Sequence, residues 1–250
     1  MTNLRNKMAL ITGSSRGLCK AIAERYAALG ADIVIHYSKN EIAAEAMVSN
    51  IKAMGANVIA LQADISKESE VERLFSESKR AFGKIDIVVA NAGLEMEESP
   101  DSEFSEEQFD HLFSISTTGA YFTMQQAALH VEDLGRIIYV ATGPTAFPVS
   151  GMSGWTGRKM TPGYLMDVLV PEMGKRGVTV NSIVPFAVDG VGVFADANKH
   201  PELRQSLMES CPMGRLGEVE DVANVAEFFA GNLSSFVSGQ HLMVNGGAIH

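Results

Sequence analysis

The sequence predicts an α/β fold in which helices cover both faces of one doubly wound parallel sheet. Short, nearly all-apolar segments alternate with amphipathic segments along almost the whole chain, a pattern typical of parallel strands that are buried on both faces. A glycine-rich turn separates the first strand-like segment from the first helical one. No linker, repeat or low-complexity tract interrupts the alternation. Residues 1–250 are therefore expected to form a single domain.

The apolar segments predict the strands, and the segments with helical spacing predict the helices between them. The expected strands are 8–11, 32–36, 58–62, 85–90, 136–141, 178–184 and 241–244. The expected helices are 18–29, 40–54, 68–82, 157–173 and 218–231, with one long helix or two in tandem over 105–129 and an irregular stretch with short helices over 189–211. Right-handed crossovers between parallel strands then give the doubly wound arrangement.

Composition and charge argue against several classes of function. The net charge of −10, with no local block of lysine or arginine, disfavours nucleic acids and acidic membranes as partners. No apolar run approaches the roughly 20 residues that cross a bilayer, and the N-terminus enters a strand without a signal-peptide pattern. Cys19 and Cys211 match no metal-ligand spacing. We expect no metal site, and reduced thiols in a cytoplasmic protein.

The turn over residues 12–19 predicts a dinucleotide site. It follows a strand and opens a helix, so its backbone N–H groups and the helix N-terminus can face a pyrophosphate. Gly13 allows the tight turn, and Gly17 allows close approach of the backbone to the phosphates; Ser15 and Leu18 belong to the same turn. An ordinary strand-to-helix connection is the simpler alternative, but the βαβ context favours nucleotide binding.

The end of the second strand predicts which nicotinamide cofactor is bound. An acidic residue there would accept hydrogen bonds from a ribose 2′-hydroxyl and favour NAD. Here His36 is followed by Tyr37, Ser38 and Lys39, without a carboxylate. Lys39, together with Arg16 of the turn, could meet a 2′-phosphate. We therefore expect NADP(H) to be favoured over NAD(H), the alternative being that both cations are solvated surface charges.

Motifs in order along the chain resemble those of the short-chain dehydrogenase/reductase family. The turn is similar to that family's TGxxxGxG motif, with Cys19 in place of the last glycine. The other matching segments are Asp64-Ile65, Asn91-Ala92-Gly93, 180–185 ending in Pro185, 212–217 and 244–247. The resemblance covers nearly the whole chain. It implies a Rossmann-type fold in which the turn, Asp64-Ile65, Asn91-Ala92-Gly93 and Pro185 bind the cofactor, with the aspartate next to the adenine.

The same resemblance implies an altered catalytic site. Lys159 matches the family's catalytic lysine, which binds the nicotinamide ribose, and the tyrosine four residues earlier is Trp155. Thr142 stands at the serine position and Ser116 at the position of the asparagine that supports a proton relay. Phe186 stands where the family has a glycine and is expected to crowd the nicotinamide pocket. An indole N–H donates a hydrogen bond but cannot release a proton near neutral pH.

Three functions remain open at this point. The first is an NADP(H)-dependent carbonyl reductase or alcohol dehydrogenase with an altered active site, acting on a small molecule. The second is a catalytically silent homologue that serves as a nucleotide sensor or partner subunit. The third is a cofactor-free lyase like the halohydrin dehalogenases, which keep the tyrosine and replace the lysine by arginine, the opposite of this chain.

Two further expectations concern the loops that contact the substrate and the helices that join subunits. The loops at 94–105, 143–154 and 186–211 are expected to set the substrate. The family commonly assembles through the helices that correspond to 105–129 and 157–173. The resemblance therefore implies a homodimer or homotetramer.

Overall fold

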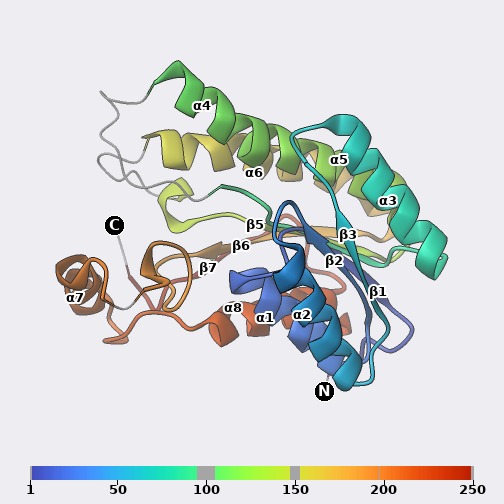
Figure 1. Cartoon of the computed structure of the whole chain (residues 1–250), viewed down its shortest axis with the longest axis horizontal. Coiled ribbons are helices and arrows are strands. Elements are labelled where there is room, and N and C mark those ends of the chain that lie inside the picture. Colours follow the sequence, from blue (N-terminus) through green and yellow to red (C-terminus); the bar gives the residue numbers. More distant parts are fainter. Residues whose placement is uncertain (1, 95–104, 147–152, 197, 249–250) are drawn as a thin grey trace.

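A computed structural model describes residues 2–94, 105–146, 153–196 and 198–248, with the side chains of 153–155 excepted. Within these residues seven parallel strands form one sheet in the order β3-β2-β1-β4-β5-β6-β7 (Figure 1). The strands are β1 Met8–Ile11, β2 Asp32–Tyr37, β3 Val58–Gln62, β4 Ile87–Ala90, β5 Arg136–Val140, β6 Thr179–Pro185 and β7 His241–Val244. The predicted fold class, a doubly wound parallel sheet between helices, is confirmed.

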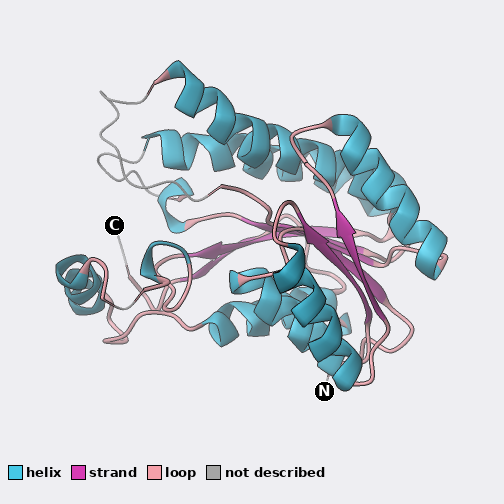
Figure 2. Ribbon diagram, viewed as in Figure 1, coloured by secondary structure: helices cyan, strands magenta, loops and turns pink. Residues whose placement is uncertain are grey.

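Helices lie on both sides of the sheet, as the ribbon coloured by secondary structure shows (Figure 2). The helices are α1 Gly17–Ala28, α2 Glu41–Ala53, α3 Glu68–Phe82, α4 Glu106–Phe113, α5 Ala120–His130, α6 Ser153–Met173, α7 Pro201–Ser210 and α8 Val219–Ala230. One face of the sheet packs against α1, α2 and α8, and the other packs against α3, α5 and α6. Among the described helices, none is both long and apolar enough to cross a membrane.

The position of strand β1 in the sheet explains why all four of its residues are apolar. All four of its side chains are buried. Ala9 and Ile11 join the hydrophobic cluster under α1, α2 and α8, whereas Met8 and Leu10 join the cluster under α3, α5 and α6. Because successive strand residues point to opposite faces, a strand covered on both sides needs an apolar residue at every position.

The structure extends the predicted helices at two places. Helix α6 begins at Ser153 rather than at 157, even though Gly154 and Gly157 have low helix propensity. The stretch 189–211, predicted as irregular with short helices, contains the ten-residue helix α7. Pro201 at its first position is a helix-start signal that the sequence prediction did not use. The other bounds agree with the predictions to within two residues.

The segment 105–129 is two helices in tandem rather than one uniform helix. Ser105 caps α4, its hydroxyl accepting a hydrogen bond from the Gln108 N–H. A π-helical segment, Ser114–Gly119, joins α4 to α5. Such widened turns are rare and are frequent at functional sites, and this one carries Ser116, a residue that the sequence places in the candidate site.

Candidate functional site

A cleft of about 780 Å³ opens at the carboxyl ends of the strands, where doubly wound sheets bind ligands. Every residue predicted from the sequence to bind the cofactor lines it. We call the part formed by residues 13–18, 37–39 and 64–65 the turn end. The part formed by Thr142, Arg158, Lys159 and Phe186 is the α6 end.

The turn end owes its shape to two glycines. Gly13 has φ +69° and Gly17 has φ +60°, a left-handed conformation that other residues adopt at a cost of about 1 kcal/mol or more. A Cβ atom on Gly13 would lie only 3.1 Å from the Ala92 Cα atom. Gly17 is the first residue of α1, and the side chain of the N-cap residue, Arg16, does not cap the helix. The geometry suits an anion placed at the start of α1.

His36 holds the same turn through its imidazole ring, and it was not predicted as a site residue. Its Nδ1 atom accepts a hydrogen bond from the Gly13 N–H at 2.9 Å, and its Nε2 atom lies 3.0 Å from the Ala63 carbonyl oxygen. The ring must therefore be neutral, with its proton on Nε2. Burial lowers the pKa of His36, which favours that neutral form. The signal in the sequence was a polar residue at the end of an otherwise apolar strand.

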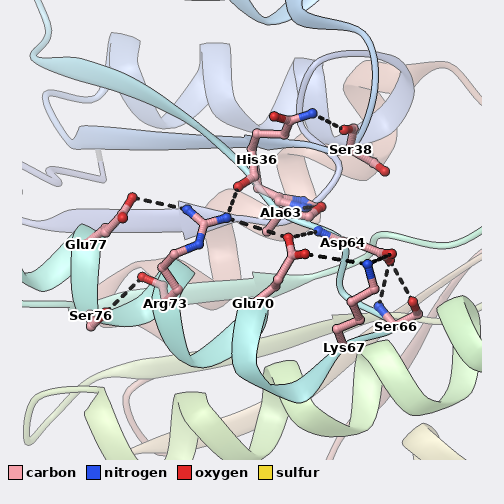
Figure 3. Close-up of polar contacts among 11 residues, drawn as sticks. His36, Ser38, Ala63, Asp64, Ser66, Lys67, Glu70, Arg73, Ser76 and Glu77 are labelled. Atoms are coloured by element: carbon pink, nitrogen blue, oxygen red, sulfur yellow. Dashed lines mark hydrogen bonds and ion pairs between the residues drawn. The ribbon is translucent and has the colours of Figure 1, made fainter.

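Asp64, the predicted adenine contact, is held in place by its neighbours (Figure 3). Its Oδ1 atom accepts hydrogen bonds from the Ser66 hydroxyl at 2.7 Å and the Ser66 N–H at 3.2 Å. Lys67 lies 3.3 Å from Oδ2, and the backbone N–H of Asp64 donates to Glu70. The hydrogen bonds from the Ser66 hydroxyl and then the Ser66 N–H, followed by Lys67, lower the pKa of Asp64. An ionised carboxylate is thus fixed at the turn end.

Cys19 replaces the last glycine of the turn motif and is accommodated by packing. Its side chain is fully buried in α1, within the hydrophobic cluster on that face of the sheet. Burial raises the pKa of the Cys19 thiol to about 12, so the thiol is protonated and unreactive. Among the described residues no group of histidine, cysteine and acidic side chains is placed to hold a metal ion.

At the α6 end, Lys159 reaches the carboxyl end of β5. Its Nζ atom donates a hydrogen bond to the Val140 carbonyl at 2.7 Å and lies 5.6 Å from the centre of the Tyr139 ring. Thr142 follows the same strand and lines the cleft. Phe186 packs against Gly143, where an added Cβ atom would lie 2.6 Å from the Phe186 ring. Lysine, hydroxyl and aromatic ring thus border one part of the cleft.

Arg158 is a second residue of the cleft that was not predicted from the sequence. Its side chain is 2% exposed and lines the cleft, and its Nη1 atom donates a hydrogen bond to the Ser116 hydroxyl at 2.8 Å. The Ser116 hydroxyl also accepts the Leu94 N–H at 3.1 Å, and Ser116 is not among the described residues that line the cleft. No motif in the sequence marks this contact, because it joins α6 to the π-helical segment 42 positions away.

Trp155 lies in the first turn of α6, four residues before Lys159. Its side chain falls outside the described residues, as do residues 95–104 and 147–152 of the loops predicted to set the substrate. The remaining predicted catalytic positions divide between the cleft, which includes Thr142 and Lys159, and the buried layer beneath it, which includes Ser116.

Known proteins match this chain over nearly its full length. The family model described as enoyl-(acyl carrier protein) reductase matches residues 13–249. The hydroxynaphthalene reductase-like protein Arp2 of Metarhizium brunneum is 35% identical over 99% of this chain and 96% of its own length. A short-chain dehydrogenase from Burkholderia cenocepacia in complex with NADP superposes with a TM-score of 0.91 at 31% identity, covering 98% of this chain and 99% of its own. The promiscuous reductase LugOII, which catalyses keto-reduction at C1 during lugdunomycin biosynthesis, gives a TM-score of 0.90 at 30% identity, covering 100% of both chains.

Proposed function

The chain belongs to the short-chain dehydrogenase/reductase family, and we propose that it is an NADP(H)-dependent oxidoreductase that reduces a carbonyl compound through an altered active site. The observation that carries the proposal is one cleft in which a glycine turn at the start of α1 and the side chain of Lys159 both take part. Nucleotide binding and carbonyl chemistry require these two features in the same cavity.

The described residues fit the nicotinamide dinucleotide. The cleft volume of about 780 Å³ lies within the roughly 300–1,000 Å³ of small-molecule sites. Gly13 leaves room for the backbone to approach phosphates, and Arg16 and Lys39 line the turn end as exposed cations. A 2′-phosphate there would meet positive charge and no carboxylate of the β2 end. The NADP bound by the Burkholderia cenocepacia relative supports the same preference.

Lys159 and Thr142 at the α6 end, and Trp155 near it in sequence, have proposed tasks. When bound, NADPH supplies the hydride. Lys159 would hold the nicotinamide ribose, and the Thr142 hydroxyl would donate a hydrogen bond to the carbonyl oxygen. Trp155 would stand in the place of the family's tyrosine, where an indole cannot deliver a proton near neutral pH. A water molecule, acting through the Thr142 hydroxyl, would then supply the proton that the substrate oxygen needs to become an alcohol.

The proposed substrate is a small aromatic ketone or the corresponding alcohol. Apolar side chains of Phe186, Val193, Phe194 and Leu207 line the cleft and would accept a flat apolar ring. The names of two relatives, a hydroxynaphthalene reductase-like protein and a keto-reductase, agree with this class.

We extend the proposal to a homodimer or homotetramer assembled through α5 and α6. Large apolar side chains are exposed on both helices: Tyr121, Leu129, Met160, Tyr164 and Val168. Exposed large apolar side chains mark protein interfaces where they gather into one patch, and we propose that these residues do so across the subunit contact.

The deciding experiment is a fluorescence titration with NADPH and with NADH, followed by turnover with a ketone panel that includes tetralone. We expect NADPH to bind more tightly than NADH and to be oxidised in the presence of at least one ketone. Absence of binding to both coenzymes would contradict the proposal. Tight NADPH binding without turnover across the panel would contradict the reductase and favour a silent homologue.

A further inference from the structure

A buried tyrosine of β5 contacts Lys159 in two ways. Tyr139 is 1% exposed and is not among the described residues that line the cleft. The Nζ atom of Lys159 lies over the Tyr139 ring, 5.6 Å from its centre. The Tyr139 hydroxyl donates a hydrogen bond to the backbone carbonyl of Lys159 at 3.3 Å. One side chain outside the cleft therefore contacts both the charged end and the backbone of the lysine.

The turn of α6 that carries Lys159 is held by side chains of neighbouring elements. Pro162 lies inside this helix and has no N–H, so it cannot donate the usual helical hydrogen bond to the Arg158 carbonyl. The Thr117 hydroxyl of the π-helical segment donates to that carbonyl at 2.8 Å. The Tyr139 hydroxyl donates to the next carbonyl along the chain. Two hydroxyls thus anchor the backbone where a proline interrupts the helical hydrogen bonding.

The Tyr139 ring also acts on the charge of the lysine. The face of an aromatic ring is the negative part of a quadrupole, and it attracts a cation that lies within about 6 Å of the ring centre. The attraction is stronger where water is excluded, and Tyr139 belongs to the hydrophobic cluster under α3, α5 and α6. The Val140 carbonyl accepts a hydrogen bond from the same Nζ atom at 2.7 Å. Ring and carbonyl together fix the place of the ammonium.

We propose that Tyr139 is a positioning residue whose ring holds the Lys159 ammonium at the carboxyl end of β5, where it would bind the nicotinamide ribose. The inference rests on the oxidoreductase function proposed above. Tyr139 would touch neither substrate nor cofactor and would act through Lys159 alone.

Two ionisable neighbours act electrostatically on this pair. Burial raises the pKa of the Cys19 thiol to about 12, and the Lys159 charge opposes that effect. Burial likewise raises the pKa of the Tyr139 phenol, and the Arg158 guanidinium opposes it. Thiol and phenol are therefore both neutral near neutral pH. Replacing the phenol by another uncharged side chain leaves the net charge around Lys159 unchanged.

The first experiment measures the Lys159 amine directly and needs neither cofactor nor turnover. The protein is treated with limiting acetic anhydride at mildly alkaline pH, and the acetylation of Lys159 is followed by mass spectrometry. Tyr139→Phe keeps the ring, whereas pentafluorophenylalanine at the same position keeps its shape and withdraws electron density from its face. A less stabilised ammonium releases its proton more readily. We therefore expect about two- to tenfold faster acetylation with the fluorinated ring than with Tyr139→Phe.

Tyr26 provides the matched control. It is also a fully buried tyrosine, and its hydroxyl donates to the Ala226 carbonyl at 2.8 Å, which joins α1 to α8 away from the described lining of the cleft. Pentafluorophenylalanine at this position should leave the acetylation rate of Lys159 unchanged. Acetylation of Lys20, which is exposed on α1, gives the reference rate within each protein.

The second experiment measures binding and turnover in Tyr139→Leu, which lacks both the ring and the hydroxyl. We expect the Kd for NADPH to rise about three- to tenfold and kcat to fall by a similar factor, with KM for the ketone unchanged. A purely structural tyrosine would lower the folded fraction and leave the Kd of the folded protein unchanged, as we expect for Tyr26→Leu. If Tyr139→Leu does not fold, the fluorinated variant takes its place.

The outcomes separate this inference from the proposed function. Equal acetylation of Lys159 in Tyr139→Phe and in the fluorinated variant would overturn the role of the ring. Wild-type Kd and kcat in folded Tyr139→Leu would overturn it as well, while leaving the reductase function intact. A wild-type protein that binds neither coenzyme would contradict the proposed function and with it the role in ribose binding, whatever the acetylation rates.

Discussion

The two ends of the cleft differ in how closely their residues match the family motifs. At the turn end, the glycines, the basic residues and Asp64 occupy the positions expected from the family motifs, and the structure brings them together around one cavity. At the α6 end, Lys159 matches the family's lysine, but the positions that correspond to the family's tyrosine, serine and asparagine hold Trp155, Thr142 and Ser116. A buried arginine joins them there. The difference supports our proposal that the chain binds its cofactor in the manner of the family and carries an altered active site.

At the α6 end, residues that differ from the family pattern lie in contact with side chains that fit the space beside them. A serine at position 116 is shorter than the asparagine of the family pattern, and the guanidinium of Arg158 bonds to its hydroxyl. Gly93 borders the same space, with no side chain to exclude the arginine. The ring of Phe186 similarly lies where Gly143 leaves room for it. These contacts support the proposed altered active site, because each larger side chain is accommodated by a small neighbour.

The largest effect is expected for Lys159→Ala, which tests whether the α6 end is still catalytic. The variant loses the Nζ atom that lies at the end of β5, and with it a positioned charge at the reacting group. We expect kcat to fall about 10²–10⁴-fold and the Kd for NADPH to rise roughly tenfold. Stopped-flow absorbance at the NADPH band measures both. Lys175→Ala, at an exposed position outside the cleft, is the control, and equal rates in the two variants would rule out a catalytic role for Lys159.

A smaller effect is expected from Arg16→Ala and Lys39→Ala, which test the cofactor preference of the turn end. Both side chains are exposed, so solvent and salt weaken their attraction for a phosphate. We expect each change to weaken NADPH binding roughly tenfold, about 1.4 kcal/mol, and to leave NADH binding unchanged. Lys20→Ala, an exposed α1 position that does not line the cleft, should affect neither coenzyme. An equal loss of affinity for NADPH and NADH would show that the two cations do not recognise a 2′-phosphate.

The turn end was predictable because its determinants are local in sequence. Gly13 and Gly17 set the backbone of one short turn, and the apolar alternation of β1 sets the strand before it. The contact between Arg158 and Ser116 joins residues 42 positions apart, and no periodicity or motif reports such a pair. The same reasoning applies to His36, whose link to the Gly13 N–H spans 23 positions. Long-range side-chain contacts of this kind require the fold before they can be recognised.

The smallest effect concerns His36 and the dependence of stability on pH. Burial lowers the pKa of His36 in the folded protein from its usual 6.5, and its Nδ1 atom must be unprotonated to accept the Gly13 N–H. The unfolded chain binds a proton on this residue as the pH falls below about 6.5, whereas the folded chain does not until a lower pH. The contribution of His36 to stability is therefore complete above about pH 7 and is lost as the pH falls, by at most about 1.4 kcal/mol per pH unit.

His36→Gln separates this contribution from that of the other histidines. Glutamine can also accept one hydrogen bond and donate another but does not titrate. Urea unfolding of both proteins at neutral and at mildly acidic pH gives the free energy of unfolding in each case. We expect the wild type to lose more stability than the variant over that interval. Identical losses would mean that protonation of His36 does not disturb the turn, and that the turn end depends on its glycines alone.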